Sequence, residues 1–234
     1  MKKYVAEFIG TMTLVILGCG TAMLVGCDAV SGGGYILTAL AFGLTIVAMA
    51  YSIGNISGCH INPAVSLGVL LSGGMSGKDF CAYVVAQCLG AFAGSGVLAA
   101  IFNLGGVADK TGGMGTNGLG GVHESIAAGL ITEIVLTFIF VIAILGVTSA
   151  KAKHGSFGGL VIGLTLVVVH ILGIGLTGTS VNPARSLGPA IMNAIVNGST
   201  GALECVWVFI VGPLVGAALA ACVYKLLEGA KESK

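Results

Sequence analysis

Charged side chains are scarce in this chain, and their scarcity excludes most soluble proteins. Asp, Glu, Lys and Arg make up only 8% of 234 residues, whereas 56% of the residues are hydrophobic and the mean hydropathy is +1.06. A soluble core could not hide so much apolar surface. The net charge of +1 and the lack of any Lys/Arg cluster in the sequence exclude nucleic acid as a partner. Composition therefore predicts an integral membrane protein in a lipid bilayer.

Sequence patterns for catalysis and metal binding are missing as well. No nucleophile, base and orienting group can be grouped from the sequence, and the seven cysteines show no metal spacing such as Cys-x-x-Cys. We therefore predict that the protein is not an enzyme and has no catalytic residue, cofactor, metal or structural disulfide. Most of the cysteines fall in apolar stretches, where we expect them to pack as small apolar side chains.

Eight apolar segments dominate the rest of the chain. Six are long enough to cross about 30 Å of hydrocarbon as helices, and they cover residues 4–26, 35–54, 80–102, 125–148, 157–175 and 203–227. Residues 63–71 and 183–194 are too short to span, and each begins with proline, whose missing N–H costs nothing in a first helical turn. We predict an all-α membrane protein with six transmembrane helices and two re-entrant half-helices.

The tripeptide Asn-Pro-Ala occurs twice, and its spacing indicates an internal duplication. The copies are Asn62, Pro63 and Ala64, and Asn182, Pro183 and Ala184, so that the offset is 182 − 62 = 120. The same offset carries residues 43–45 (Gly-Leu-Thr) onto 163–165 and residues 66–68 (Ser-Leu-Gly) onto 186–188. Matched Gly, Thr, Asn and Pro are hard to obtain by chance in an apolar chain. We predict one channel domain, residues 1–234, with repeats at approximately 1–103 and 124–228 joined by an extracellular loop.

The basic residues predict the orientation of the chain in the membrane. One side of the six-span arrangement carries Lys2, Lys3, Lys78, Lys151, Lys153, Lys225, Lys231 and Lys234, and the other carries Lys110 and Arg185. By the positive-inside rule both termini are cytoplasmic, and compact termini favour a bacterial inner membrane. Three spans per repeat then make the repeats inverted, so that the two half-helices meet near the midplane. We expect the Gly-rich residues 105–121 to form a surface loop on the outer side.

Five short stretches carry a pattern that is typical of one family. They are residues 6–11 (Ala-Glu-Phe-Ile-Gly-Thr), 57–65 (Ser-Gly-Cys-His-Ile-Asn-Pro-Ala-Val), 86–87 (Ala-Gln), Glu133 and 180–186 (Ser-Val-Asn-Pro-Ala-Arg-Ser). With these stretches the chain resembles the aquaporins, or major intrinsic proteins, over nearly its whole length, and most closely the bacterial water channels. The resemblance implies a passive water channel that excludes ions and protons, and a homotetramer with one pore in each subunit.

The paired half-helices explain this chemistry physically. Their unpaired first-turn N–H groups carry the positive ends of two helix dipoles, which repel a cation in a low-dielectric pore. Asn62 and Asn182 each add an NH₂ donor at that point, so a passing water offers its oxygen to both and the hydrogen-bonded water wire is broken. The same asparagines are expected to cap their half-helices.

The residues before each motif are expected to line the pore with backbone. We predict extended backbone at residues 58–61 and 178–181, with carbonyl groups as water acceptors at Gly58, Cys59, His60, Ile61, Gly178 and Ser180. Glu7 and Glu133 are ionisable groups inside spans, for which a proton or ion pathway is one interpretation. The resemblance implies the other interpretation, in which they brace the two loops by accepting backbone N–H bonds.

Selectivity is assigned by resemblance to the family's aromatic/arginine filter. The matching residues are Phe42, His170, Thr179 and Arg185, a water-selective pattern. His170 replaces the glycine of glycerol facilitators, Phe42 replaces their usual tryptophan, and Ser186 replaces their usual aspartate. A lone histidine in an apolar run would otherwise be a core residue, and Ile210 departs from the second aromatic expected after Phe209.

Four further interpretations stay open from the sequence. A glycerol or small neutral solute facilitator is the alternative within the family, and a secondary transporter also uses inverted repeats but needs a coupling-ion site. Lys2-Lys3 followed by an apolar stretch and 16–19 (Ile-Leu-Gly-Cys) resembles a lipoprotein signal, although Glu7 interrupts it. Cys59 lies three residues before Asn62, as Thr179 lies three before Asn182. Some aquaporins have a mercury-sensitive cysteine at the latter kind of position, so the resemblance makes Cys59 a candidate site of mercury block.

Overall fold

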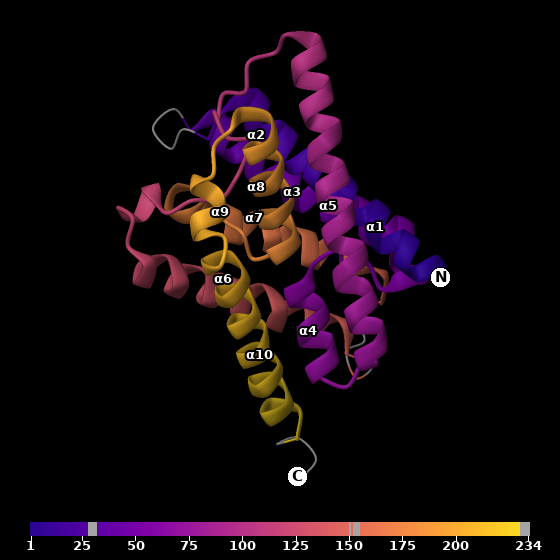
Figure 1. Cartoon of the computed structure of the whole chain (residues 1–234). Helices are drawn as coiled ribbons and strands as arrows, with labels where there is room; N and C mark the ends of the chain where they lie inside the picture. Colours follow the sequence, from indigo (N-terminus) through magenta and orange to yellow (C-terminus); the bar gives the residue numbers. More distant parts are fainter. Residues whose placement is uncertain (28–31, 150, 152–154, 230–234) are drawn as a thin grey trace.

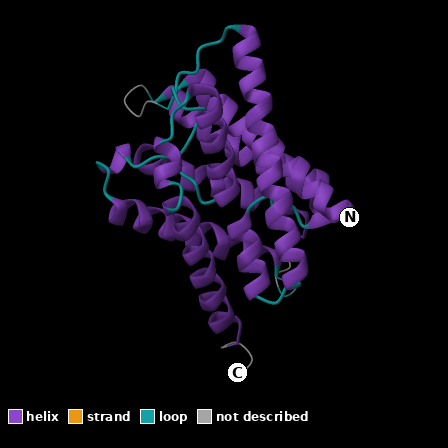
Figure 2. Cartoon of the chain, in the orientation of Figure 1, coloured by secondary structure: helices purple, strands orange, loops and turns teal. Residues whose placement is uncertain are grey.

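A computed structural model describes residues 1–27, 32–149, 151 and 155–229 of the chain. Helices and loops make up these residues, without a strand among them (Figure 2). Six stretches are long and apolar enough to cross a membrane: Lys2–Val25, Gly33–Ser57, Gly77–Gly105, Ile126–Thr148, Gly158–Thr177 and Gly201–Gly229. Each overlaps a predicted span, and the ends differ by a few residues. The all-α, multi-pass prediction is confirmed.

The helices follow one another in the same order in both halves. The first half contains α1 (Lys2–Leu14), η1 (Val15–Cys19, a π-helical turn), α2 (Gly20–Val25), α3 (Gly33–Ser57), α4 (Pro63–Leu71) and α5 (Gly77–Gly105). The second contains α6 (Ile126–Thr148), α7 (Gly158–Thr177), α8 (Pro183–Asn197), α9 (Gly201–Cys205) and α10 (Val208–Gly229), with short 3₁₀ turns at η2 (Gly120–Val122) and η3 (Gly155–Phe157). Helices α4 and α8 are the two predicted half-helices, and α8 runs three residues further than predicted.

Local signals in the sequence set the ends of these helices. The Ser76 hydroxyl accepts a hydrogen bond from the Asp79 N–H at the start of α5, and Ser125 caps α6 in the same way. Helices α3 and α7 both end at a glycine in the left-handed region, Gly58 and Gly178. The chain therefore leaves the second span of each half, α3 or α7, by the same turn and enters a loop before a half-helix.

Packing pairs the helices within and across the halves. Helix α1 packs on α5, α6 packs on α10, and α3 crosses α7. Figure 1 shows α4 toward the end of the bundle where the chain terminates and α8 toward the opposite end. The two half-helices thus approach each other from opposite ends of the bundle, and their first turns meet in its interior.

The segment between α5 and α6 is not a simple surface loop. Met114, Asn117 and Leu119 are only 4%, 3% and 5% exposed, and the N–H of Gly118 donates to the carbonyl of Thr177. The loop folds inward because its polar groups find partners on the α7–α8 segment. The prediction of a surface loop at 105–121 is therefore wrong for residues 114–119.

The first span is an integral part of the bundle. It runs helically from Lys2 to Val25, and both Glu7 and Cys19 are fully buried. This placement favours the membrane-span interpretation over a lipoprotein signal. Of the basic residues used for orientation, Lys153, Lys231 and Lys234 lie outside the described residues.

Candidate functional site

The two Asn-Pro-Ala motifs are joined directly by their asparagine side chains. The Asn62 Nδ2 donates to the Val181 carbonyl at 2.7 Å, and the Asn182 Nδ2 donates to the Ile61 carbonyl at 3.0 Å. Each asparagine therefore bonds the residue that precedes the other motif. Both side chains are 3% exposed, so this reciprocal pair lies inside the protein.

The same side chains cap the half-helices with their oxygens. The Asn62 Oδ1 accepts from the Ala64 N–H at 2.8 Å, and the Asn182 Oδ1 accepts from the N–H groups of Ala184 and Arg185 at 3.1 and 3.2 Å. An asparagine amide has two N–H donors, and the crossed bonds account for one on each side chain. The second N–H of each stays available beside two helix N-termini, which carry partial positive charge.

Each loop is fastened to a buried glutamate. The Glu7 carboxylate accepts four hydrogen bonds, from the Ser57 hydroxyl at 2.7 Å, the backbone N–H groups of His60 and Ile61 at 2.9 and 2.6 Å, and the Gln87 amide at 2.8 Å. A buried charge is tolerable when hydrogen bonds of this kind surround it.

Glu133 repeats this arrangement in the second half. Its carboxylate accepts from the Thr177 hydroxyl at 2.7 Å and from the N–H groups of Ser180 and Val181 at 2.9 and 2.8 Å. It is fully buried, like Glu7. The structure therefore directs each carboxylate at the loop of its own half.

The backbone before each motif is not extended, contrary to our prediction. Cys59 and Ile61 have φ of 52° and 41°, and Thr179 and Val181 have φ of 49° and 45°. Successive N–H groups of an extended strand point to opposite sides, whereas two consecutive N–H groups here reach one carboxylate. Alternating left-handed residues make this possible, as in backbone nests that bind anions.

This geometry also directs the carbonyl groups. In a trans peptide the C=O of one residue is antiparallel to the N–H of the next. Since the N–H groups of His60 and Ile61 point to Glu7, the carbonyls of Cys59 and His60 point away from it, and the Ser180 carbonyl likewise points away from Glu133. The Ile61 carbonyl differs from these three, because it accepts the Asn182 amide.

Phe42, His170 and Arg185 come together from three helices. The rings of Phe42 and His170 stack with centroids 4.5 Å apart and an interplanar angle of 24°, and the Arg185 Cζ lies 4.9 Å from the Phe42 centroid. All three side chains are at most 3% exposed. We call these residues the outer cluster. Thr179 is fully buried in the loop before Asn182.

Several polar atoms of these residues have no protein partner. The His170 Nδ1 lies 3.0 Å from the Leu166 carbonyl oxygen. Because a carbonyl can only accept, Nδ1 is the donor, and the other ring nitrogen, Nε2, has no partner. The Thr179 Oγ1 and the Arg185 Nε are also buried and unpartnered. Buried polar groups are normally hydrogen-bonded to protein or ordered water, so these atoms mark positions suited to water.

A narrow pocket connects the outer cluster with the paired asparagines. Its volume is about 10 Å³, close to the ~10–15 Å³ that a single water requires. It is lined by Leu14, Phe42, Ile46, His60, Asn62, Phe140, Leu166, His170, Ser180, Val181, Asn182 and Arg185. Polar groups from both loops thus face a mostly apolar wall.

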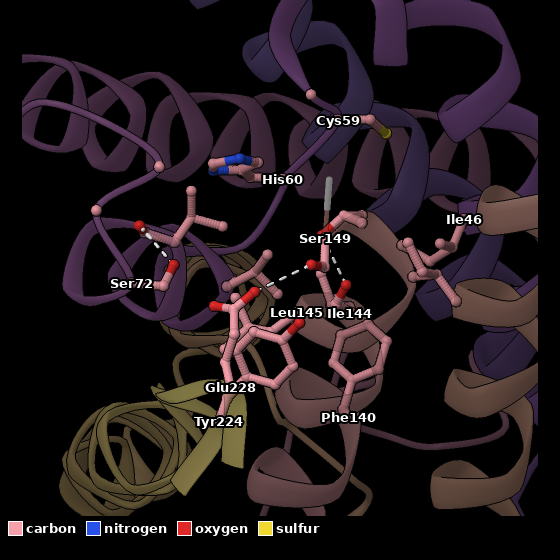
Figure 3. Close-up of a pocket in the computed structure, with 17 residues that line it drawn as sticks. Ile46, Cys59, His60, Ser72, Phe140, Ile144, Leu145, Ser149, Tyr224 and Glu228 are labelled. Atoms are coloured by element: carbon pink, nitrogen blue, oxygen red, sulfur yellow. Dashed lines mark hydrogen bonds between the residues drawn. The ribbon is translucent and has the colours of Figure 1, made fainter. Parts of the chain in front are cut away.

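A wide cavity opens from the same loop toward the end of α10. It has a volume of about 530 Å³ and includes Gly58, Cys59 and His60 from the loop and Tyr224 and Glu228 from α10 (Figure 3). His60 lines both the wide cavity and the narrow pocket. Ile46 and Phe140 also line both, so the two spaces adjoin at these three residues.

The inward loop supplies residues that the sequence analysis missed. The Arg185 Nη1 donates to the Gly115 carbonyl at 3.0 Å. The Asn117 side chain accepts from the Ser186 hydroxyl at 2.7 Å and donates to the Thr177 carbonyl at 3.1 Å. An asparagine among glycines is common in turns, so no local signal distinguished Asn117 from an ordinary loop residue.

Six spans around two re-entrant half-helices, whose loops line an internal passage, define a polytopic membrane protein of the channel type. The family model for the major intrinsic proteins matches residues 1–224, and the chain belongs to that family. Its relatives include the protein named Aquaporin Z of Brucella melitensis biotype 1, 45% identical over 98% of this chain and 99% of that protein. Aquaporin Z of Rhodopseudomonas palustris is 42% identical over 97% of this chain and 93% of that protein.

A solved structure supports the same assignment. The X-ray structure of the aquaglyceroporin from Plasmodium falciparum is similar with a TM-score of 0.85 and 26% sequence identity, and the match covers 95% of this chain and 94% of that one. The recognition of the family and of its fold from sequence is thereby confirmed.

Proposed function

We propose that the protein is a passive, water-selective channel that carries osmotically driven flow across a membrane and excludes protons and ions. The observation that carries this proposal is the narrow pocket, with a volume of about one water, between the outer cluster and the crossed asparagines. Both relatives named above are called Aquaporin Z. The protein acts without chemistry on the permeant and is a channel rather than an enzyme.

Water passes the paired asparagines in single file. Each water accepts the remaining N–H of Asn62 and Asn182, and its own hydrogens turn outward to the carbonyls of Cys59, His60 and Ser180. A proton would need a continuous chain of waters in one orientation. The two half-helix dipoles additionally repel a cation at this point.

The outer cluster selects by size and charge. Phe42 and His170 restrict the width, while Arg185 places a fixed positive charge at the passage. The unpartnered atoms of His170, Thr179 and Arg185 replace part of the hydrogen bonds of an entering water. A pocket of about 10 Å³ has room for about one water and is too small for a glycerol molecule, so water is favoured over the solute alternative.

Glu7 and Glu133 hold the loops rather than move protons. Their carboxylate oxygens are occupied by seven donors from the protein, of which four are backbone N–H groups of the two loops. A coupling site for a secondary transporter needs a carboxylate that is open to the permeant. The hydrogen bonds of these two groups favour an uncoupled channel.

The wider organisation of the protein follows from the same proposal. Inverted repeats at approximately 1–103 and 124–228 bring the half-helices in from opposite faces, and both termini lie in the cytoplasm of a bacterial cell with the protein in its inner membrane. The channel assembles as a homotetramer with one water pore in each subunit.

Shrinkage of proteoliposomes in a stopped-flow instrument tests the function. The vesicles are challenged with an impermeant osmolyte and then with glycerol, and the native protein is compared with His170→Gly. We expect fast water efflux and little glycerol entry for the native protein, with a gain of glycerol entry in the variant. Fast glycerol entry through the native protein would instead indicate a glycerol facilitator. If neither water nor glycerol crosses faster than in vesicles without protein, the result contradicts a channel.

A further inference from the structure

The first span changes its helix type where it passes the outer cluster. Between α1 and α2, residues Val15–Cys19 form the π-helical turn η1, and Val15, Gly18 and Cys19 within it are buried. A π turn carries one residue more than an α turn and often lies at a functional site. None of the roles described above uses this segment.

Gly18 in this turn lies directly against the ring of Phe42. A Cβ placed on Gly18 would overlap the ring atom Cε1 and would lie 2.5 and 2.6 Å from Cδ1 and Cζ. The ring is rigid and Phe42 is 1% exposed, and the space described beside it is the narrow pocket that it lines. It also stacks on His170 and lies beside Arg185. The ring cannot move away from Gly18 without moving relative to those two side chains.

The next residue of the turn supports the other side of the cluster. A Cβ on Gly115 would lie 3.1 Å from the Cβ of Cys19 and 3.2 Å from its carbonyl oxygen, so these backbones are in close contact. The Gly115 carbonyl in turn accepts the hydrogen bond of Arg185. The turn η1 therefore contacts Phe42 directly through Gly18, and through Cys19 it contacts Gly115, which holds Arg185.

We propose that Gly18 is a positioning residue that sets the width of the narrow pocket by fixing the ring of Phe42. The inference rests on the proposed function, since it assumes that the outer cluster limits the passage of water. Any side chain at position 18 displaces the ring, and the pocket has no volume to spare for that displacement. Glycine at this position is thus required for permeation in addition to helix packing.

The test compares Gly18→Ala with Gly20→Ala in proteoliposomes. Gly20 is a matched control, because a Cβ there would lie 2.7 Å from Leu98 Cδ2, a flexible side-chain end outside the outer cluster. We expect Gly18→Ala to lower the water permeability per protein by about tenfold, equivalent to ~1.4 kcal/mol of added barrier, and Gly20→Ala to keep the native value. Unchanged flux in Gly18→Ala, or an equal loss in both variants, would overturn the inference.

A second substitution shows whether Gly18 acts through Phe42. Valine at position 42 lacks all three ring atoms that an added methyl would meet. In Gly18→Ala/Phe42→Val we expect water permeability to return to the level of Phe42→Val, and a flux that stays low would contradict the inference. If Gly18→Ala alone fails to fold, we expect Phe42→Val to restore folding, because it removes the ring atoms that the added methyl meets. Failure of Gly18→Ala/Phe42→Val to fold would then overturn the inference.

Phe42→Val alone separates this inference from the proposed function. If the outer cluster is the selective constriction, this variant admits more glycerol than the native protein. Unchanged glycerol and water permeability in Phe42→Val would disprove the role of the cluster itself. If Phe42→Val gains glycerol entry but Gly18→Ala keeps the native water flux, only the role of Gly18 is disproved.

Discussion

Gly43 of α3 and Gly163 of α7 pack against each other, and they are separated by the 120 residues of the sequence repeat. A Cβ on either residue would overlap the carbonyl oxygen of the other. The pair lets the two helices approach until their backbones touch, which is the usual role of small residues between membrane helices. The crossing of α3 and α7 is therefore made by residues that correspond in the two halves.

Replacing Gly43 by alanine is expected to destabilise the protein. The added methyl meets backbone atoms, which cannot rotate away, so overpacking of about 1–3 kcal/mol is expected. Thermal unfolding in detergent measures the loss. Gly146→Ala in α6 is the control, because a Cβ there meets nothing within 4 Å. Equal stability of the two variants would contradict a tight α3–α7 crossing.

Asn62→Asp is expected to damage both the joint between the loops and the exclusion of cations. The carboxylate still caps α4 but cannot donate to the Val181 carbonyl, and two oxygens then face each other at a cost of about 1–3 kcal/mol. A negative charge also offsets the positive helix ends. Proteoliposomes with an internal pH dye should show a proton or cation leak that the native protein lacks. If the Asn62→Asp channel leaks neither protons nor cations, the result counts against exclusion of cations by the half-helix dipoles.

Glu133→Gln tests bracing against proton transfer. In the native protein the N–H groups of Ser180 and Val181 donate to the Glu133 carboxylate. The NH₂ of a glutamine would face one of these donors and leave it unpaired, so the free energy of unfolding should fall by about 1–3 kcal/mol. The water permeability per folded protein of Glu133→Gln should stay near that of the native protein. In neither protein should it vary with pH. Transport by the native protein that depends on pH, and loses that dependence in Glu133→Gln, would indicate a proton pathway instead.

Mercury should block the channel in part through Cys59. This cysteine lines the wide cavity and lies three residues before Asn62, so a bound mercury ion would obstruct the route to the narrow pocket (Figure 3). We expect Cys59→Ser to reduce the inhibition of water flux. Cys81→Ser is the control, because Cys81 is more exposed but lies outside that cavity. Full inhibition of Cys59→Ser would exclude this site.

The sequence alone determined the transmembrane plan, because its signals are local. Apolar runs of sufficient length specify spans, and Asn-Pro at two positions specifies the starts of α4 and α8, as the caps observed there illustrate. The exact repeat of 120 residues also places equivalent residues, such as Gly43 and Gly163, at equivalent points of the bundle. These features need no knowledge of which helices are neighbours.

Tertiary structure decided how those local elements build the passage. The crossed bonds of Asn62 and Asn182, the inward fold of residues 114–119 and the contact of Gly18 with Phe42 all join segments that are distant in sequence. Even the backbone before each motif, predicted as extended, follows from the position of a glutamate in another helix, because two successive N–H groups must reach one carboxylate. Local sequence propensity does not specify partners that are distant in the sequence, and only the packing of the helices brings them together.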